Sequence, residues 1–262
     1  MRLVLSELRL RRVSLIAWAV AIAVLMLLLI GVYPSIRDSP DLNAVYGSLS
    51  PNAQALLGGS DLTSPVGYLS TQVFAFFLPA VILVFVLGRS AATLAGEEED
   101  RTLDLLLAQP LARWAAYIEK SLAVTISLAV LGLATLIPLL AFDSAVKFNL
   151  GVANLSAVVV QMCLFALALG MWTQAIAAAT GHRATGLAVV TGYTVVSYLV
   201  YGLSGSIEWL AHLKPLTLWR WYLGNNPLES GFGIAECLVM AGVAAAGGIA
   251  GTWLFQRRNL HA

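Results

Sequence analysis

The stretch LIAWAVAIAVLMLLLIGVY, which covers residues 15–33, contains no charged side chain. An α-helix rises about 1.5 Å per residue, so roughly 20 apolar residues cross the hydrocarbon core of a bilayer. The run is longer than the core of a signal peptide, and no small-residue cleavage site follows it. Residues 13–33 are therefore predicted to form a transmembrane helix that stays in the protein as an anchor.

The composition of the whole chain agrees with a membrane environment. Hydrophobic residues make up 59% of the 262 positions and charged residues only 11%, which is more apolar than a soluble domain. The net charge of +1, without clustered Lys and Arg, argues against a nucleic-acid partner. Cys163 and Cys237 lie in apolar stretches without a C-x-x-C spacing, so we expect buried thiols and no metal site or disulfide.

Five further uncharged runs are long enough to cross a bilayer. The sequence therefore predicts an all-α fold, a polytopic membrane protein with six transmembrane helices in a single domain over residues 1–262. Pro79 and Pro138 lie within the second and third runs, where kinks are expected because proline removes a backbone hydrogen bond. The five additional spans are predicted at 66–88, 121–142, 152–180, 184–203 and 237–256.

The distribution of Lys and Arg predicts the orientation, because these residues stay on the cytoplasmic side during insertion. With the N-terminus inside, 11 of the 15 basic residues are cytoplasmic. Both termini are then cytoplasmic, and so is the acidic stretch after the second span. The external segments are 34–65, with a short helix that begins at Ser50 and Pro51, and 204–232, an aromatic segment expected at or in the membrane interface.

The densest charge lies in GEEEDRTLDLLLAQPLARW, residues 96–114. Thr102 can cap a helix over 102–109 that Pro110 ends, and the preceding acids favour the positive end of its dipole. One face of this helix is apolar, and the opposite face carries Arg101 and Asp104. Solvated loop charges at the membrane surface are the simpler interpretation, but a capped helix with an apolar face indicates a docking element. The acids are Glu97, Glu98, Glu99 and Asp100, and the apolar face is Leu103, Leu106 and Leu107.

This stretch resembles the cytoplasmic coupling region of permease subunits in the type-2 export group of ABC transporters. The resemblance lies in an acid-x-acid pair, Thr-Leu-acid, a Leu run, Pro-Leu-x-Arg and a Lys seven residues later. It extends to the six spans, to DLTSPVGYL before the second span, and to LKPLTLWRWYLGNNPLESG before the last. The residues it implies for ATPase coupling are Glu97, Glu98, Glu99, Arg101, Thr102, Leu103, Asp104, Leu106, Leu107, Pro110 and Arg113.

The resemblance implies that ATP is bound by a separate ATPase subunit in two copies. This chain, with a second permease chain that is identical or homologous, would enclose a path lined mainly by the second and fifth spans. The sequence agrees in one respect, because a phosphate-binding loop needs Lys after Gly. Lys120, Lys147 and Lys214 follow Glu, Val and Leu, so no cofactor is expected on this chain and it is not expected to be an enzyme.

Two other functions remain open. The motif around Ser204, GLSG, resembles the nucleophile motif of rhomboid intramembrane proteases, but a base would have to be His212 or His261, neither of which lies in the last span. An ion-coupled secondary transporter would normally carry ionisable groups near the membrane midplane, and the six runs lack them at their centres. The cargo and the identity of the partner chain do not follow from the sequence.

Two local patterns have alternative interpretations. The N-terminal arginines, Arg2, Arg9, Arg11 and Arg12, fit an interfacial helix, but simple charge anchoring is at least as good an explanation. Small residues four apart, Gly247 and Gly251 in the last span and Gly88, Ala92 and Gly96 after the second, indicate close helix packing within the subunit more than a dimer interface.

Overall fold

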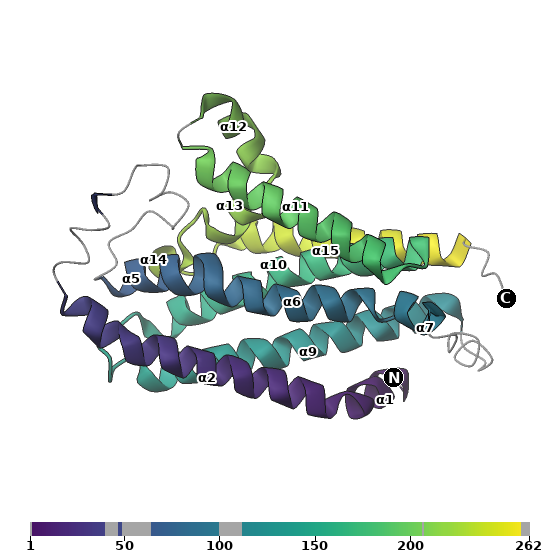
Figure 1. Cartoon of the computed structure of the whole chain (residues 1–262), viewed down its shortest axis with the longest axis horizontal. Helices are drawn as coiled ribbons and strands as arrows, with labels where there is room; N and C mark the ends of the chain where they lie inside the picture. The colour runs from purple at the N-terminus through teal and green to yellow at the C-terminus, as the bar shows by residue number, and fades with distance from the viewer. Residues whose placement is uncertain (1, 40–46, 49–63, 100–111, 206, 258–262) are drawn as a thin grey trace.

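Six long apolar helices form one bundle in the computed structural model, which describes residues 2–39, 47–48, 64–99, 112–205 and 207–257 (Figure 1). All six are long and apolar enough to cross a membrane, as the sequence predicted. They are α2 (Arg12–Arg37), the continuous segment Pro65–Ala91, α9 (Arg113–Phe142), α10 (Gly151–Thr180), α11 (Arg183–Leu203) and α15 (Ile234–Arg257).

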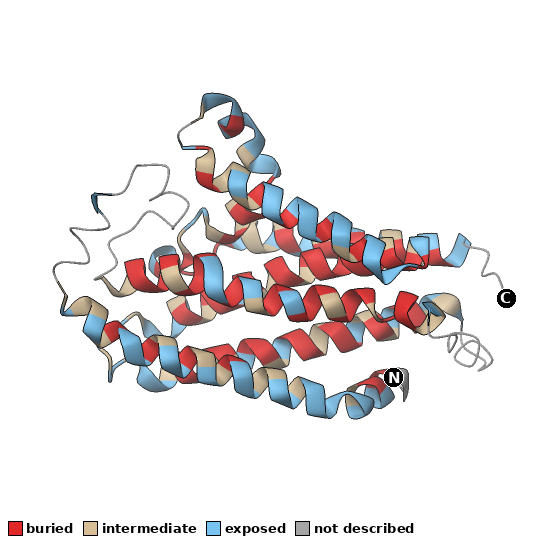
Figure 2. Ribbon diagram, in the orientation of Figure 1, coloured by how far each residue is buried: buried red, intermediate tan, exposed pale blue. Residues whose placement is uncertain are grey.

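Helix α10 lies at the centre of the bundle. It packs against α15, α6, α11 and α9, and α2 covers α9 from the outside. A helix that is apolar on all sides is suited to this position, because each of its faces meets another helix. In Figure 2 buried residues accordingly concentrate on α10 and on the inner faces of its neighbours.

The outer surface of the bundle is also apolar. On α2 the buried residues Ile22, Met26 and Ile30 recur every four positions, and the other sides of the helix expose residues such as Val20 and Leu28. Helices α11 and α15 expose similar residues (Figure 2). An apolar outer surface of this extent fits a lipid environment and would be a liability in water.

Both described ends of the chain lie at the same end of the bundle, which we call the terminal end (Figure 1). The opposite end, the distal end, carries the short helices of the segment before the last span: α12 (Glu208–Leu213), η2 (Lys214–Leu216), α13 (Leu218–Leu223) and α14 (Pro227–Ser230). This aromatic segment folds back into the bundle. Tyr222 stacks on Phe165 of α10, and Trp219 packs against the same ring at a tilt. Trp219 Nε1 donates to Thr194 O of α11 over 3.2 Å.

The second span is irregular on the distal side of Pro79. It consists of α5 (Pro65–Tyr68), the π-helical segment η1 (Leu69–Phe77) and α6 (Leu78–Ala91). In this geometry Leu78 N bonds to Val73 O, so the next carbonyl, Phe74 O, faces a proline that has no N–H. Tyr222 Oη donates to Phe74 O over 2.9 Å and satisfies it. The distortion expected at Pro79 is therefore a π-helical segment that a distal tyrosine stabilises. Helix α9 continues through Pro138.

The Gly247–Gly251 pair packs α15 closely on its neighbours within the subunit, as the spacing indicated. A methyl group at Gly251 would overlap the Tyr117 hydroxyl, and one at Gly247 would meet the Trp172 backbone nitrogen at 3.1 Å. The same expectation was wrong for Gly88, beside which there is open space.

Candidate functional site

The acidic stretch begins at the terminal end of the second span. After α6, residues 92–94 form a turn, and the short helix α7 (Ala95–Glu99) follows. Ala91 and Ala95 pack on Ala177, near the end of α10, so α7 is held against the turn that joins α10 to α11. Of the predicted coupling residues, Glu97, Glu98 and Glu99 lie in α7, and Arg113 is the half-buried first residue of α9.

The remaining predicted coupling residues lie outside the described residues. These are Arg101, Thr102, Leu103, Asp104, Leu106, Leu107 and Pro110, and with them the helix predicted over 102–109. The external helix predicted from Ser50 lies outside them as well.

Glu99 makes the connection between α7 and the fifth span. The α10–α11 turn is short because Gly181 adopts the left-handed conformation, with φ of 74°, and His182 follows in extended form. Arg183 then begins α11 beside Glu99. Its backbone N–H donates to Glu99 Oε1 over 2.9 Å, and its Nε lies 2.5 Å from Glu99 Oε2. Since the preceding residue, His182, offers no side-chain cap, a carboxylate from another helix caps α11.

Glu97 belongs to a second group of charges that is largely buried. Its carboxylate accepts a hydrogen bond from Lys120 Nζ of α9. Lys120 Nζ also donates to Glu7 Oε2 over 2.7 Å, and Glu7 Oε1 accepts from Arg89 Nη2 of α6 over 2.7 Å. The side chain of Lys120 is 2% exposed, that of Arg89 is 8% exposed and that of Glu7 is 9% exposed. We call Glu7, Arg89, Glu97 and Lys120 the charge cluster.

Glu7 is at the centre of the charge cluster, and the sequence interpretation missed it. It lies on α1 (Arg2–Leu10), a separate helix that packs on α9, so two of the N-terminal arginines, Arg2 and Arg9, belong to a docked helix, whereas Arg12 begins α2. Burial raises the pKa of Glu7, but the hydrogen bond from Lys120 and the charges of Lys120, Arg89 and Arg11 outweigh it, and the net pKa is below its ordinary value. The available signal was that Glu7 is the only acid in residues 1–37.

A groove of about 670 Å³ lies between the second and fifth spans. Phe76, Val84 and Gly88 line one wall, and Val195 and Tyr198 of α11 line the other. The groove is almost wholly apolar, and its Thr194 hydroxyl already donates to Val190 O. Open space beside Gly88 contributes to this groove, which explains why that glycine makes no close helix contact. The resemblance named these same two spans as the lining of a path.

The protease hypothesis has no support in the geometry. Ser204 is buried, and its hydroxyl donates to Tyr201 O over 2.7 Å. The His212 ring lies against Glu208 O, 3.2 Å away, on the exposed side of α12. Among the residues that the structure describes, no histidine makes a hydrogen bond to Ser204, and His261 lies outside them.

Side chains that commonly bind metal ions are not clustered in the described part of the chain. Within the described ranges no group of three His, Cys, Asp or Glu side chains could hold a metal ion. Gln174, within the α10 span, accepts a hydrogen bond at Oε1 from Ser121 Oγ of α9 over 3.2 Å. This is a helix–helix contact of the kind common in membrane proteins.

Comparison with protein families gives one match, to the family described as ABC-2 family transporter protein, over residues 1–260. Comparisons with curated proteins and with solved structures find no significant match. The family match covers the six spans and the acidic stretch alike, and members of this family are membrane components of ABC transporters rather than their ATPases. The chain therefore belongs to the ABC-2 transporter family and is a multi-pass membrane permease subunit.

Proposed function

We propose that this chain forms half of the pathway of an ATP-driven exporter and that a separate ATPase moves it through residues 97–113. The observation that carries the proposal is the junction at α7. Helix α6, one wall of the groove, runs into α7 through a single turn, and α11, the other wall, is capped by Glu99 of α7. A displacement of α7 therefore reaches both walls through contacts that are short and directional.

The orientation follows from the distribution of charge. Arg12, Arg89 and Arg183 lie at the terminal ends of their spans, as does Arg257. Basic residues of this kind stay in the cytoplasm, so we assign the terminal end, with both termini and α7, to the cytoplasmic side of the cell membrane. An ATPase that binds ATP in the cytoplasm can then reach the acidic stretch.

In this mechanism the ATPase binds the helix predicted over 102–109. The leucine face of that helix, with Thr102 and Pro110 at its ends, fits a groove on the ATPase, and Arg101, Asp104 and Arg113 contact its rim. Closure of two ATPase subunits on ATP then pushes α7. The charge cluster transmits this motion from α7 to α9 through Lys120 and to α1 through Glu7. Since Arg89 of α6 also pairs with Glu7, helices α1, α6, α7 and α9 move together at the terminal end.

The groove between the second and fifth spans indicates the class of cargo. Because its walls offer almost no polar group, it favours molecules with a large apolar part. A second permease chain, identical or homologous, would face this groove and close the pathway.

The decisive experiment separates transport from ATP hydrolysis. The chain is reconstituted with the ATPase that co-purifies with it, and Glu99→Gln, Arg183→Gln and the double variant are compared. Either single change breaks the partly exposed ion pair, which is worth about 1 kcal/mol or less, so transport per ATP should fall by up to about fivefold. The double variant should lose little more, because both changes remove the same ion pair.

Glu229→Gln, a change of an exposed acid at the distal end, is the matched control and should leave transport per ATP unchanged. Normal transport by the Glu99 and Arg183 variants would exclude this coupling route. Uptake driven by a proton gradient without any ATPase would favour the alternative, an ion-coupled secondary transporter.

A further inference from the structure

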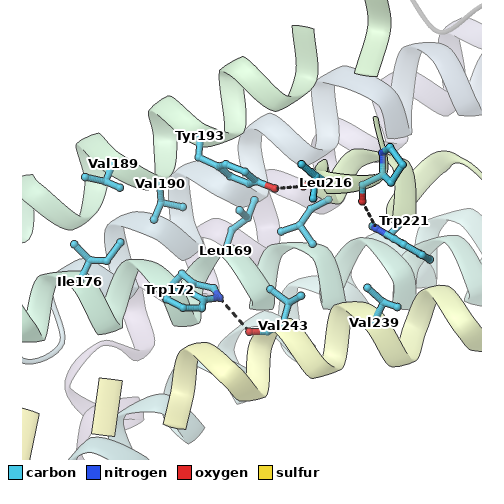
Figure 3. A pocket seen from close by; sticks show the side chains of 12 residues that line it. Leu169, Trp172, Ile176, Val189, Val190, Tyr193, Leu216, Trp221, Val239 and Val243 are labelled. Atoms are coloured by element: carbon cyan, nitrogen blue, oxygen red, sulfur yellow. Dashed lines mark hydrogen bonds between the residues drawn. The ribbon is translucent and has the colours of Figure 1, made fainter. Parts of the chain in front are cut away.

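A second groove lies on the other side of the fifth span, between α10, α11, α15 and the distal segment (Figure 3). Its volume is about 570 Å³. Val189, Val190 and Tyr193 of α11 face it, whereas the groove described above is lined by Thr191, Thr194 and Val195 of the same helix. The two grooves are therefore separate, and only the first adjoins the second span.

The walls of this second groove are apolar and rich in aromatic rings. Each polar ring atom in it already donates to a backbone carbonyl: Tyr193 Oη to Leu216 O over 3.0 Å, Trp172 Nε1 to Val243 O over 3.2 Å, and Trp221 Nε1 to Pro215 O over 3.0 Å (Figure 3). No lining side chain keeps a free hydrogen for a ligand. An occupant must therefore present an apolar surface to the groove.

Two cations lie next in sequence to residues that line the groove. Lys214 immediately precedes the lining residue Pro215, and its Nζ lies 5.2 Å from the centre of the Tyr201 ring, near the end of α11. The Arg220 guanidinium carbon lies 5.6 Å from the centre of the Trp221 ring, which lines the groove. Both side chains are only partly exposed.

These cations differ from the other basic side chains at the distal end. Arg37 is paired with Asp38 over 2.9 Å, and Asp38 is also close enough to Lys147 for that charge to act on it. Among the described residues, neither Lys214 nor Arg220 has a carboxylate within ion-pair distance. Each cation lies over an aromatic ring, and no carboxylate of the described residues compensates its charge.

We propose that this groove binds an anionic phospholipid of the distal leaflet, with an acyl chain along α11 and the headgroup phosphate between Lys214 and Arg220. The apolar walls take the chain, and the cations lie where a headgroup would be, at the end of α11. The lipid is a resident component of the permease and not its cargo. It fills the space between α11 and the distal segment, and α11 is a span with little of its surface buried within the chain.

The test uses vesicles of equal parts phosphatidylglycerol and phosphatidylcholine. The purified protein is incubated with them, extracted gently, and the retained lipid is counted by native mass spectrometry. We expect retention of phosphatidylglycerol in preference to phosphatidylcholine. Because a cation near a membrane surface is worth about 1 kcal/mol, Lys214→Gln and Arg220→Gln should each lower this preference roughly fivefold.

Two variants complete the test. Val243→Trp fills the groove and should reduce retention of both lipids, whereas Lys147→Gln, a distal cation away from the groove, should change neither. Retention without headgroup preference, or a preference unchanged in Lys214→Gln with Arg220→Gln, would overturn the proposal. Crosslinking of a cysteine at Val189 to a second permease copy would also overturn the proposal, because the groove would then be a protein interface. Release of the lipid on ATP hydrolysis would overturn it as well, because the lipid would then be cargo.

Discussion

Glu7 is the residue whose replacement tests the charge cluster most sharply. Glu7→Gln keeps the size of the side chain but removes the carboxylate that Arg89 and Lys120 share. Lys120 retains Glu97, whereas Nη2 of Arg89 loses the carboxylate oxygen to which it donates, in a side chain that is only 8% exposed. Removing one partner of a buried ion pair costs about 3–5 kcal/mol, because the other charge stays desolvated.

Most of this cost should appear as release of α1 rather than as unfolding of the bundle. Helix α1 is joined to α2 only by Arg11, and its described buried side chains are Val4 and Glu7. Hydrogen exchange of the α1 amides, measured by mass spectrometry in detergent, reports this local opening. Glu7→Gln should accelerate their exchange at least about a hundredfold, which corresponds to roughly 3 kcal/mol.

Two comparisons make the result specific. Glu208→Gln, at an exposed acid on α12, should leave the exchange of α1 unchanged. The double variant Glu7→Gln with Arg89→Gln should destabilise α1 docking by less than the sum of the two single changes, because it leaves no unpaired Arg89 charge. Unaltered α1 exchange in Glu7→Gln, or strict additivity in the pair, would refute the assignment of Glu7 as the charge that docks α1.

Three further outcomes are expected. Gly251→Ala should lower the free energy of unfolding, measured by thermal denaturation, by about 1–3 kcal/mol, because its methyl group overlaps the Tyr117 phenol. Gly248→Ala, whose methyl group faces open space, should be neutral or stabilising, and equal effects of the two changes would contradict the close packing of Gly251 on Tyr117. Tyr222→Phe leaves Phe74 O unsatisfied and should cost about 1–3 kcal/mol in the same assay, and no loss would show that the π-helical segment does not need the phenol. Docking lowers the Glu7 pKa, so the contribution of Glu7 to α1 docking is complete above the ordinary value of 4.5 and is lost as pH falls through the lower docked value. The protection factors of the α1 amides, which correct for the intrinsic pH dependence of exchange, should therefore fall only in acid, and a fall near neutral pH would contradict this.

The spans were predictable because crossing a bilayer imposes a length and a composition that a single sequence displays. Helix α9 starts at Arg113, before the predicted span at 121–142, because a helix does not end where the lipid ends. The π-helical segment was not predictable in the same way. Pro79 indicated a lost hydrogen bond, but Tyr222, which is distant in sequence, determines how the freed carbonyl is satisfied.

The site was predictable in its location and not in its pairings. Four consecutive acids in an apolar chain marked the region after the second span. Which cation each acid meets depends on how α7 packs on α10, and the pairing of Glu99 with Arg183 joins residues 84 positions apart. Lys120 was visible as the last residue of the resemblance and Arg89 only as a basic residue that sets the orientation, because burial and a shared partner are properties of the folded bundle.

The central claim is that α7 moves both walls of the groove between the second and fifth spans. Val84 and Val195 line opposite walls and are exposed, so each can carry a spin label in an otherwise cysteine-free protein. The distance between the labels is measured by pulsed electron resonance in the complex with the ATPase, with and without ATP. The account predicts that ATP shifts this distance in the parent protein and that Glu99→Gln with Arg183→Gln abolishes the shift. A shift that survives in that double variant, or a distance that ATP does not change, would contradict it.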